Sequence, residues 1–111
     1  MIDYLEIEGR LTMAIPALQW ATQSHDVPNI EGFNDMFGAA ADAMKAIGLT
    51  KVKRNEDDVS GITSNTLTAV TCLRCGKVFT LVVMVAGNSS SATKTILDKL
   101  LHEIPKHIPN L

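Results

Sequence analysis

The feature that most constrains the fold is the segment 77–86, which reads Lys-Val-Phe-Thr-Leu-Val-Val-Met-Val-Ala and is apolar at almost every position. A strand with apolar side chains on both faces lies inside a sheet and must be covered on both sides. We therefore expect residues 77–86 to form a central strand, covered by helices or by a partner subunit. The apolar run is far shorter than the roughly 20 residues of a membrane span, so we expect no membrane association.

Shorter β-rich segments precede this strand at residues 49–53, 59–63 and 67–72. The charged stretch 54–58 reads as a turn between the first two, and Ser64-Asn65 as a turn before the third. These segments follow one another without an intervening helical pattern. Neighbours of this kind pair in antiparallel order.

Two segments have the spacing of amphipathic helices. In the first, residues 30–47, apolar side chains recur every three or four positions at Phe33, Met36, Phe37, Ala40, Met44 and Ile47. Asn29 is a candidate N-cap, and Gly48 stands where a left-handed C-cap belongs. In the second, residues 91–104, the same spacing is found at Ile96, Leu97, Leu100 and Ile104.

The second helix carries charges at helical spacing, which predicts the surface pairs Lys94–Asp98 and Lys99–Glu103. Pro105 and Pro109 should end the helix. We therefore expect residues 104–111 to be a loose C-terminal tail.

The N-terminal segment 4–15 fits two patterns. Its apolar residues alternate with polar ones, as in a half-buried strand, but several of them also recur at helical spacing. Pro16 excludes a straight helix through both halves of the segment. We prefer a strand to about residue 15 and a short helix over 17–24, with Pro16 in its first turn.

Together these elements predict the α+β class: one domain over residues 1–111, with an antiparallel sheet of about four or five strands and two main helices packed mainly on one face. The formal net charge is −2, which argues against a nucleic-acid partner. The N-terminus has neither the basic nor the apolar region of a signal peptide, so we expect a cytoplasmic protein.

The sharpest chemical feature is Cys72-Leu73-Arg74-Cys75-Gly76, which we place at the tip of a hairpin. Residues 72–79 resemble the first half of a zinc knuckle, as in zinc ribbons and in fingers with two Cys and two His ligands. Structural zinc takes four ligands. The resemblance therefore implies a zinc site with two ligands from Cys72 and Cys75.

His102 and His107 are the candidates for the other two zinc ligands. The 26 residues between Cys75 and His102 exceed the roughly dozen of such a finger, and the helix breaks between the two histidines. A site shared by two subunits, with two thiolates from each, is an alternative. Thiol redox chemistry is another, since a C-x-x-C pair can cycle between dithiol and disulfide. A purely structural pair, with Cys72 packed as a small apolar residue, is the simplest interpretation.

A second candidate site combines His25 and Asp26 as a general base with its carboxylate, and Trp20 and His25 as binding residues. No nucleophile in the sequence stands out to accompany them. A loop contact explains His25-Asp26 equally well.

Three charged or polar stretches have simple interpretations beside functional ones. Glu56-Asp57-Asp58 are candidate metal ligands or a solvated turn. Lys51, Lys53 and Arg54 are candidate anion ligands or a charged outer face. Residues 87–91 open a helix, which favours either anion binding or ordinary capping.

From these observations we expect a small binding or interaction module that acts as a homodimer, with a small-molecule or protein ligand that the sequence does not choose. A zinc-binding or thiol-redox protein is the first alternative. A small enzyme with a pocket near His25 and Asp26 is the second.

Overall fold

The computed structural model describes residues 6–7, 10–11, 17–26 and 33–109 of the chain. Its elements, in chain order, are β1 (Glu6–Ile7), β2 (Arg10–Leu11), β3 (Ala17–Asp26), α1 (Phe33–Ala46), β4 (Thr50–Arg54), β5 (Val59–Ile62), β6 (Thr66–Cys75), β7 (Val78–Gly87), α2 (Ser90–Glu103) and a 3-10 helix, η1 (Ile104–His107).

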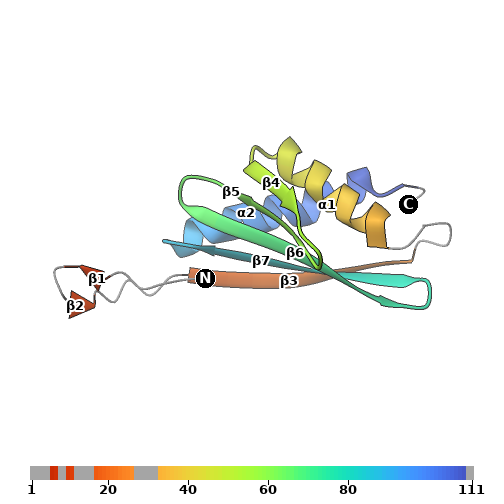
Figure 1. Ribbon diagram of the computed structural model, residues 1–111, viewed down its shortest axis with the longest axis horizontal. Coiled ribbons are helices and arrows are strands. Elements are labelled where there is room, and N and C mark those ends of the chain that lie inside the picture. The colour runs from red at the N-terminus through yellow and green to blue at the C-terminus, as the bar shows by residue number, and fades with distance from the viewer. Residues whose placement is uncertain (1–5, 8–9, 12–16, 27–32, 110–111) are drawn as a thin grey trace.

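Within this part of the chain, β3 to β7 form one antiparallel sheet of five strands in the order β3-β7-β6-β5-β4. Both helices lie on the same side of it, α2 over β3 and β7 and α1 over β4, β5 and β6 (Figure 1). The α+β class, the antiparallel sheet and the one-sided helices are confirmed. β1 and β2 pair with each other and lie apart from this sheet (Figure 1).

The apolar segment forms β7, which is paired along its whole length with β3 on one side and β6 on the other. Its odd-numbered residues Phe79, Leu81, Val83 and Val85 point to the helix side and are fully buried. They form the centre of a core that takes in the inner faces of α1 and α2. The expectation of an internal strand is confirmed, but the helices that the structure describes cover only one of its two faces.

Helix α1 ends as its sequence predicts. Gly48 adopts a φ of 96°, and the N–H of Leu49 donates to the carbonyl of Met44 at 3.0 Å. This is the bond pattern that closes a helix at a left-handed glycine. The candidate N-cap Asn29 lies outside the described residues.

The short helix expected over 17–24 is wrong, because these residues belong to the ten-residue strand β3. Pro16 is compatible with either structure, so it did not decide the matter. The ten residue pairs that β3 makes with the apolar strand β7 outweigh a marginal single turn of helix. The strand expected to about residue 15 is described only at β1 and β2.

The loose tail expected over 104–111 is also wrong for the part that the structure describes. Pro105 ends α2, but the chain continues as η1, and Ile104 and Ile108 are buried in the core. Two large apolar side chains so close together favour packing over exposure. Residues 110–111 lie outside the described part.

The hairpin tip is shorter than expected. β6 continues through Cys75, and the turn consists of Gly76 and Lys77 alone. Gly76 has a φ of 63°, the conformation that two-residue hairpin turns require of a glycine in their first position. Cys72 and Cys75 are therefore strand residues.

Candidate functional site

The most unusual surface is the side of the sheet that no described helix covers, the lower side in Figure 1. We call it the open face, formed by every second residue of three paired strands. It consists of Leu18, Trp20, Thr22, Ser24 and Asp26 of β3, Val78, Thr80, Val82, Met84 and Ala86 of β7, and Leu67, Ala69, Thr71, Leu73 and Cys75 of β6.

Large apolar side chains are exposed across this face. Leu18 is 62% exposed, Trp20 63% and Leu73 61%, and Leu67, Val78 and Met84 are also exposed. Among the residues that define the face, only Asp26, at one end, carries a charge. The solvent side of an ordinary antiparallel sheet is polar and charged. An apolar patch without charges usually marks an interaction site.

The two faces of β3 are the reverse of what the position of the helices predicts: large apolar side chains face away from the helices, and polar side chains face them. Its open-face residues include Leu18 and Trp20, while its helix-side residues include Gln19, Gln23 and His25. A strand of an isolated subunit would turn its apolar residues toward the helices. The arrangement becomes regular only if the open face is covered as well.

The polar residues on the helix side of β3 are fixed by contacts with α2. The side-chain amide of Gln23 donates to the carbonyl of Leu101 at 2.7 Å, and that of Gln19 to the carbonyl of Ser90 at 3.3 Å. In a regular helix, Leu101 would receive a hydrogen bond from residue 105, but Pro105 has no N–H. Gln23 supplies the missing donor, and this contact holds β3 in its orientation.

His25 belongs to the same cluster. Its Nε2 lies 2.8 Å from Oε1 of Gln23, and burial lowers the pKa of the imidazole. Asp26 is exposed on the opposite face of β3, because adjacent strand residues point in opposite directions. The structure therefore does not bring His25 and Asp26 together, and it separates Trp20 from His25 in the same way.

Cys72 and Cys75 also lie on opposite faces of their strand. Cys72 is buried on the helix side, whereas Cys75 is exposed on the open face. Residues three apart in a strand cannot direct both sulfurs at one ion within a subunit. Burial raises the pKa of the Cys72 thiol to about 11, so this cysteine is a poor nucleophile.

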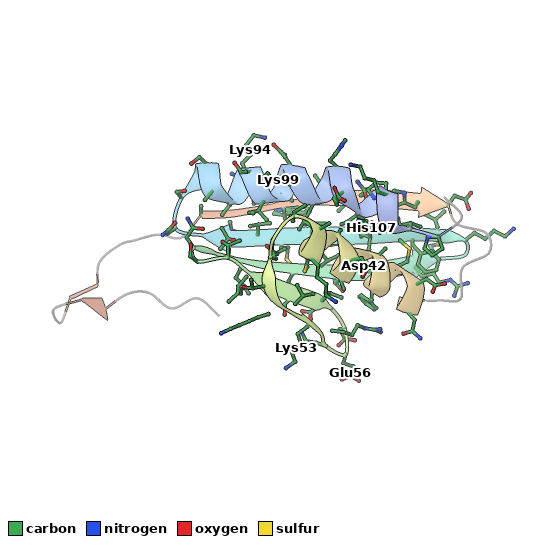
Figure 2. The ribbon with its side chains drawn as sticks, turned by 90° about the horizontal axis from the view of Figure 1, so that it is seen from above. Asp42, Lys53, Glu56, Lys94, Lys99 and His107 are labelled. Carbon is green, nitrogen blue, oxygen red and sulfur yellow. The ribbon has the colours of Figure 1, made fainter. Side chains whose placement is uncertain are left out.

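The two candidate histidine ligands lie near the end of α2. His102 is exposed, and Nε2 of His107 lies 3.0 Å from a carboxylate oxygen of Glu103. Within the described residues, no group of three or more potential metal ligands is clustered. Glu103 also contacts Lys106 at 3.6 Å, so the expected Lys99–Glu103 pair is wrong, whereas Lys94–Asp98 forms at 3.1 Å. Figure 2 shows Lys94 and Lys99 on the outer side of α2.

The remaining polar stretches take mostly structural roles. In the 54–58 turn, Asn55 donates its backbone N–H to the carbonyl of Asp58 at 2.8 Å. At the start of α2, the Ser89 hydroxyl accepts a hydrogen bond from the N–H of Ala92 at 3.1 Å, which is ordinary capping. Arg54 is an exception, because it points to the helix side and lies over the ring of Phe37.

Of the open-face residues, the sequence singled out only Trp20, Asp26 and Cys75. Leu18, Leu67, Leu73 and Met84 were missed because apolar strand residues are normally assigned to the core. The alternation of Leu18 and Trp20 with Gln19 and Ala21 is a usable signal. It was obscured by the helical spacing of the same segment.

Compared with known proteins, the chain matches no family model and no curated protein. In the part of the chain that the structure describes, neither helix is long and apolar enough to cross a membrane. The functional argument therefore depends on the geometry of the site.

Proposed function

We propose that the protein is a small interaction module that works as a homodimer, and that two copies meet through their open faces. The observation that carries the proposal is the reversed order of β3, which turns Leu18 and Trp20 away from the helices and Gln19 and Gln23 toward them. This order is favourable in a subunit whose sheet is covered on both sides.

The chemistry of the face favours a second copy as its partner. A surface without charges in its centre is complementary to itself, since bringing two such surfaces together desolvates no unpaired charge. The long-range repulsion between two chains of net charge −2 is small. A partner with a strongly charged surface would leave its own charges buried and unpaired.

The area of the open face approaches that of a typical protein–protein interface. The strands β3, β6 and β7 each have ten residues, and at about 3.3 Å per residue they give a strip about 33 Å long and about 14 Å wide. The projected area of this strip is roughly 450 Å², and its accessible surface is larger because the side chains protrude from the sheet. Specific interfaces bury roughly 800 Å² per partner.

A matched pair of substitutions tests the proposal. Thr22→Glu places a charge on the open face, opposite Val82 of β7, whereas Thr95→Glu places the same charge on the exposed side of α2. In sedimentation velocity over a range of concentrations, the unmodified chain should be a dimer, and Thr22→Glu should dissociate at least about tenfold more readily. Thr95→Glu should match the unmodified chain. A chain that sediments as a monomer throughout, or two variants with equal effects, would refute the proposal.

The geometry favours neither a zinc-binding or thiol-redox protein nor a small enzyme with a pocket near His25 and Asp26 over this function. In the proposal the protein works in the reducing cytosol, and both of its cysteines are free thiols. It has no nucleic-acid partner, because the open face carries no Lys or Arg.

A further inference from the structure

A second candidate site lies where the β4–β5 turn meets α1 and β6. A pocket of about 550 Å³ opens there, within the usual volume range of ligand sites. It is lined by Asn34 and Phe37 of α1, Arg54 of β4, Glu56 and Asp57 of the turn, and Thr71, Cys72 and Leu73 of β6.

The pocket runs beside the edge of β6. Its lining includes the consecutive residues Thr71, Cys72 and Leu73, whose side chains point alternately to the two faces of the sheet. A cavity that all three residues line lies at the edge of the strand. β5 pairs with β6 only as far as Val70. Beyond Val70, and among the described residues, β6 has a strand neighbour only in β7, so the backbone of 72–75 is available on its other side.

One end of this edge is closed by the β4–β5 turn. The hydroxyl of Thr71 donates to the carbonyl of Asp57 at 2.8 Å, which ties the turn to β6 where β5 ends. Figure 2 shows Glu56 at the outer rim of the molecule, on this turn. A strand added along 72–75 would therefore end against the turn.

Arg54 lies at that end, and two contacts hold its side chain in place. Its guanidinium lies over the ring of Phe37, 4.3 Å from the centroid, and its Nη1 donates to Oδ1 of Asn34 at 3.1 Å. These contacts fix the guanidinium plane and leave further N–H groups to bind a carboxylate. Leu73 lines the same pocket from the open-face side of β6 and is exposed, so it offers an apolar contact there.

We propose that this pocket binds an extended peptide, which adds a strand to the edge of β6 at 72–75 and places one carboxylate on Arg54. Main-chain hydrogen bonds would supply affinity, and an apolar side chain against Leu73 would supply selectivity. The carboxylates of Glu56 and Asp57 disfavour a strongly acidic segment, so a lone carboxylate after an apolar residue fits best. The carboxylate comes either from a chain terminus or from an acidic side chain.

Synthetic pentapeptides test the proposal on the full chain. The probes are acetyl-Thr-Val-Thr-Val-Leu as the free acid, its C-terminal amide, and an amide with Glu in place of the central Thr; further free acids end in Val, Phe or Met. Affinity is measured by calorimetry, and the contacted residues by shifts of backbone amide resonances. We expect the free acid to shift the resonances of 72–75. If only the free acid binds, a chain terminus supplies the carboxylate; binding of the Glu peptide shows that a side chain supplies it.

Arg54→Gln should weaken binding at least about tenfold, since it removes a charge-assisted hydrogen bond. Lys53→Gln is the matched control, because Lys53 points to the other face of β4 and should leave affinity unchanged. Asn34→Ala, which frees Arg54 from one of its contacts, should weaken binding less. Failure of every probe to bind at millimolar concentration would overturn the proposal. Equal affinity of Arg54→Gln and the unmodified chain, or resonance shifts that spare both 72–75 and the residues lining the pocket, would do so as well.

Discussion

Trp20 on β3 and Met84 on β7 lie directly opposite each other, and both side chains face away from the helices. A cross-strand pair of an aromatic and a thioether side chain is a favourable contact in a core. Here it lies on the open face, where Asp26, at one end, is the one charged residue among those that define the face. The pair belongs to the interface that we propose.

The contact between Gln23 and Leu101 should contribute measurably to stability. Gln23→Ala leaves the carbonyl of Leu101 without a donor, because Pro105 cannot provide one. We expect the free energy of unfolding to fall by about 1–2 kcal/mol in urea denaturation. Gln19→Ala, which removes a longer and exposed contact, should cost less. Equal costs for the two variants would show that the missing N–H of Pro105 is unimportant.

Two glycine substitutions should have opposite effects on stability. A Cβ at Gly87 would lie 2.7 Å from the backbone oxygen of Asn65, so Gly87→Ala should destabilise the fold by about 1–3 kcal/mol. Gly38 is exposed in α1 with no atom within 4 Å of the added Cβ. Gly38→Ala should therefore stabilise by about 0.5–1 kcal/mol through helix propensity. Thermal unfolding of the two variants measures the direction of each change in stability. A stabilised Gly87→Ala would be inconsistent with the close approach of Gly87 to Asn65.

His25 should make stability depend on pH. Burial lowers the pKa of the folded imidazole below its ordinary 6.5. In the window between these two pKa values the unfolded chain binds more protons, so stability rises with pH. The contribution is complete above about pH 6.5 and is lost as the pH falls toward the lower, folded value.

Urea denaturation at a series of pH values checks this slope. His25→Gln should flatten it, whereas His102→Gln, at an exposed position on α2, should not. The carboxyl of Glu103 has its pKa lowered from 4.5 by the hydrogen bond from His107, so it acts in a more acidic range. A slope that persists in His25→Gln would assign the effect to another group.

The two cysteines should respond differently to substitution. Cys72→Ala removes a buried sulfur and should cost about 1–2 kcal/mol, while Cys75→Ala at an exposed position should change stability by less than about 0.5 kcal/mol. Neither zinc nor a chelator should shift the melting temperature, because the sulfurs lie on opposite faces. Equal losses on substitution, together with a melting temperature that zinc raises, would restore the zinc interpretation.

Local signals predicted those parts of the fold that local physics determines. The spacing of Met36, Ala40 and Met44 with Gly48 gave α1 and its end, and the apolar run gave β7 as an internal strand. The turn at Gly76-Lys77 was also readable, because a glycine followed by one residue between two β-rich segments suits a two-residue hairpin. The C-x-x-C pattern instead predicted a longer hairpin tip that included both cysteines.

The identity of β3 depended on partners far away in the sequence. Residues 17–26 have neither a strong helical nor a strong strand pattern, and their structure is fixed by pairing with β7 and by the contacts of Gln19 and Gln23 with α2. In β3 the apolar residues Leu18 and Trp20 face away from the helices and the glutamines face them. This arrangement made the strand hard to predict, and it also defines the candidate site. Departures from local sequence rules are expected at functional sites.

The fluorescence of Trp20 tests the central claim most directly, because it is the only tryptophan of the chain and lies on the open face. The emission spectrum is recorded while the protein is diluted from high concentration. If two copies meet through their open faces, dilution should shift the emission to longer wavelength as Trp20 becomes exposed to water, and Thr22→Glu should show the long-wavelength spectrum at concentrations where the unmodified chain does not. An emission spectrum typical of exposed tryptophan at all concentrations would contradict the account.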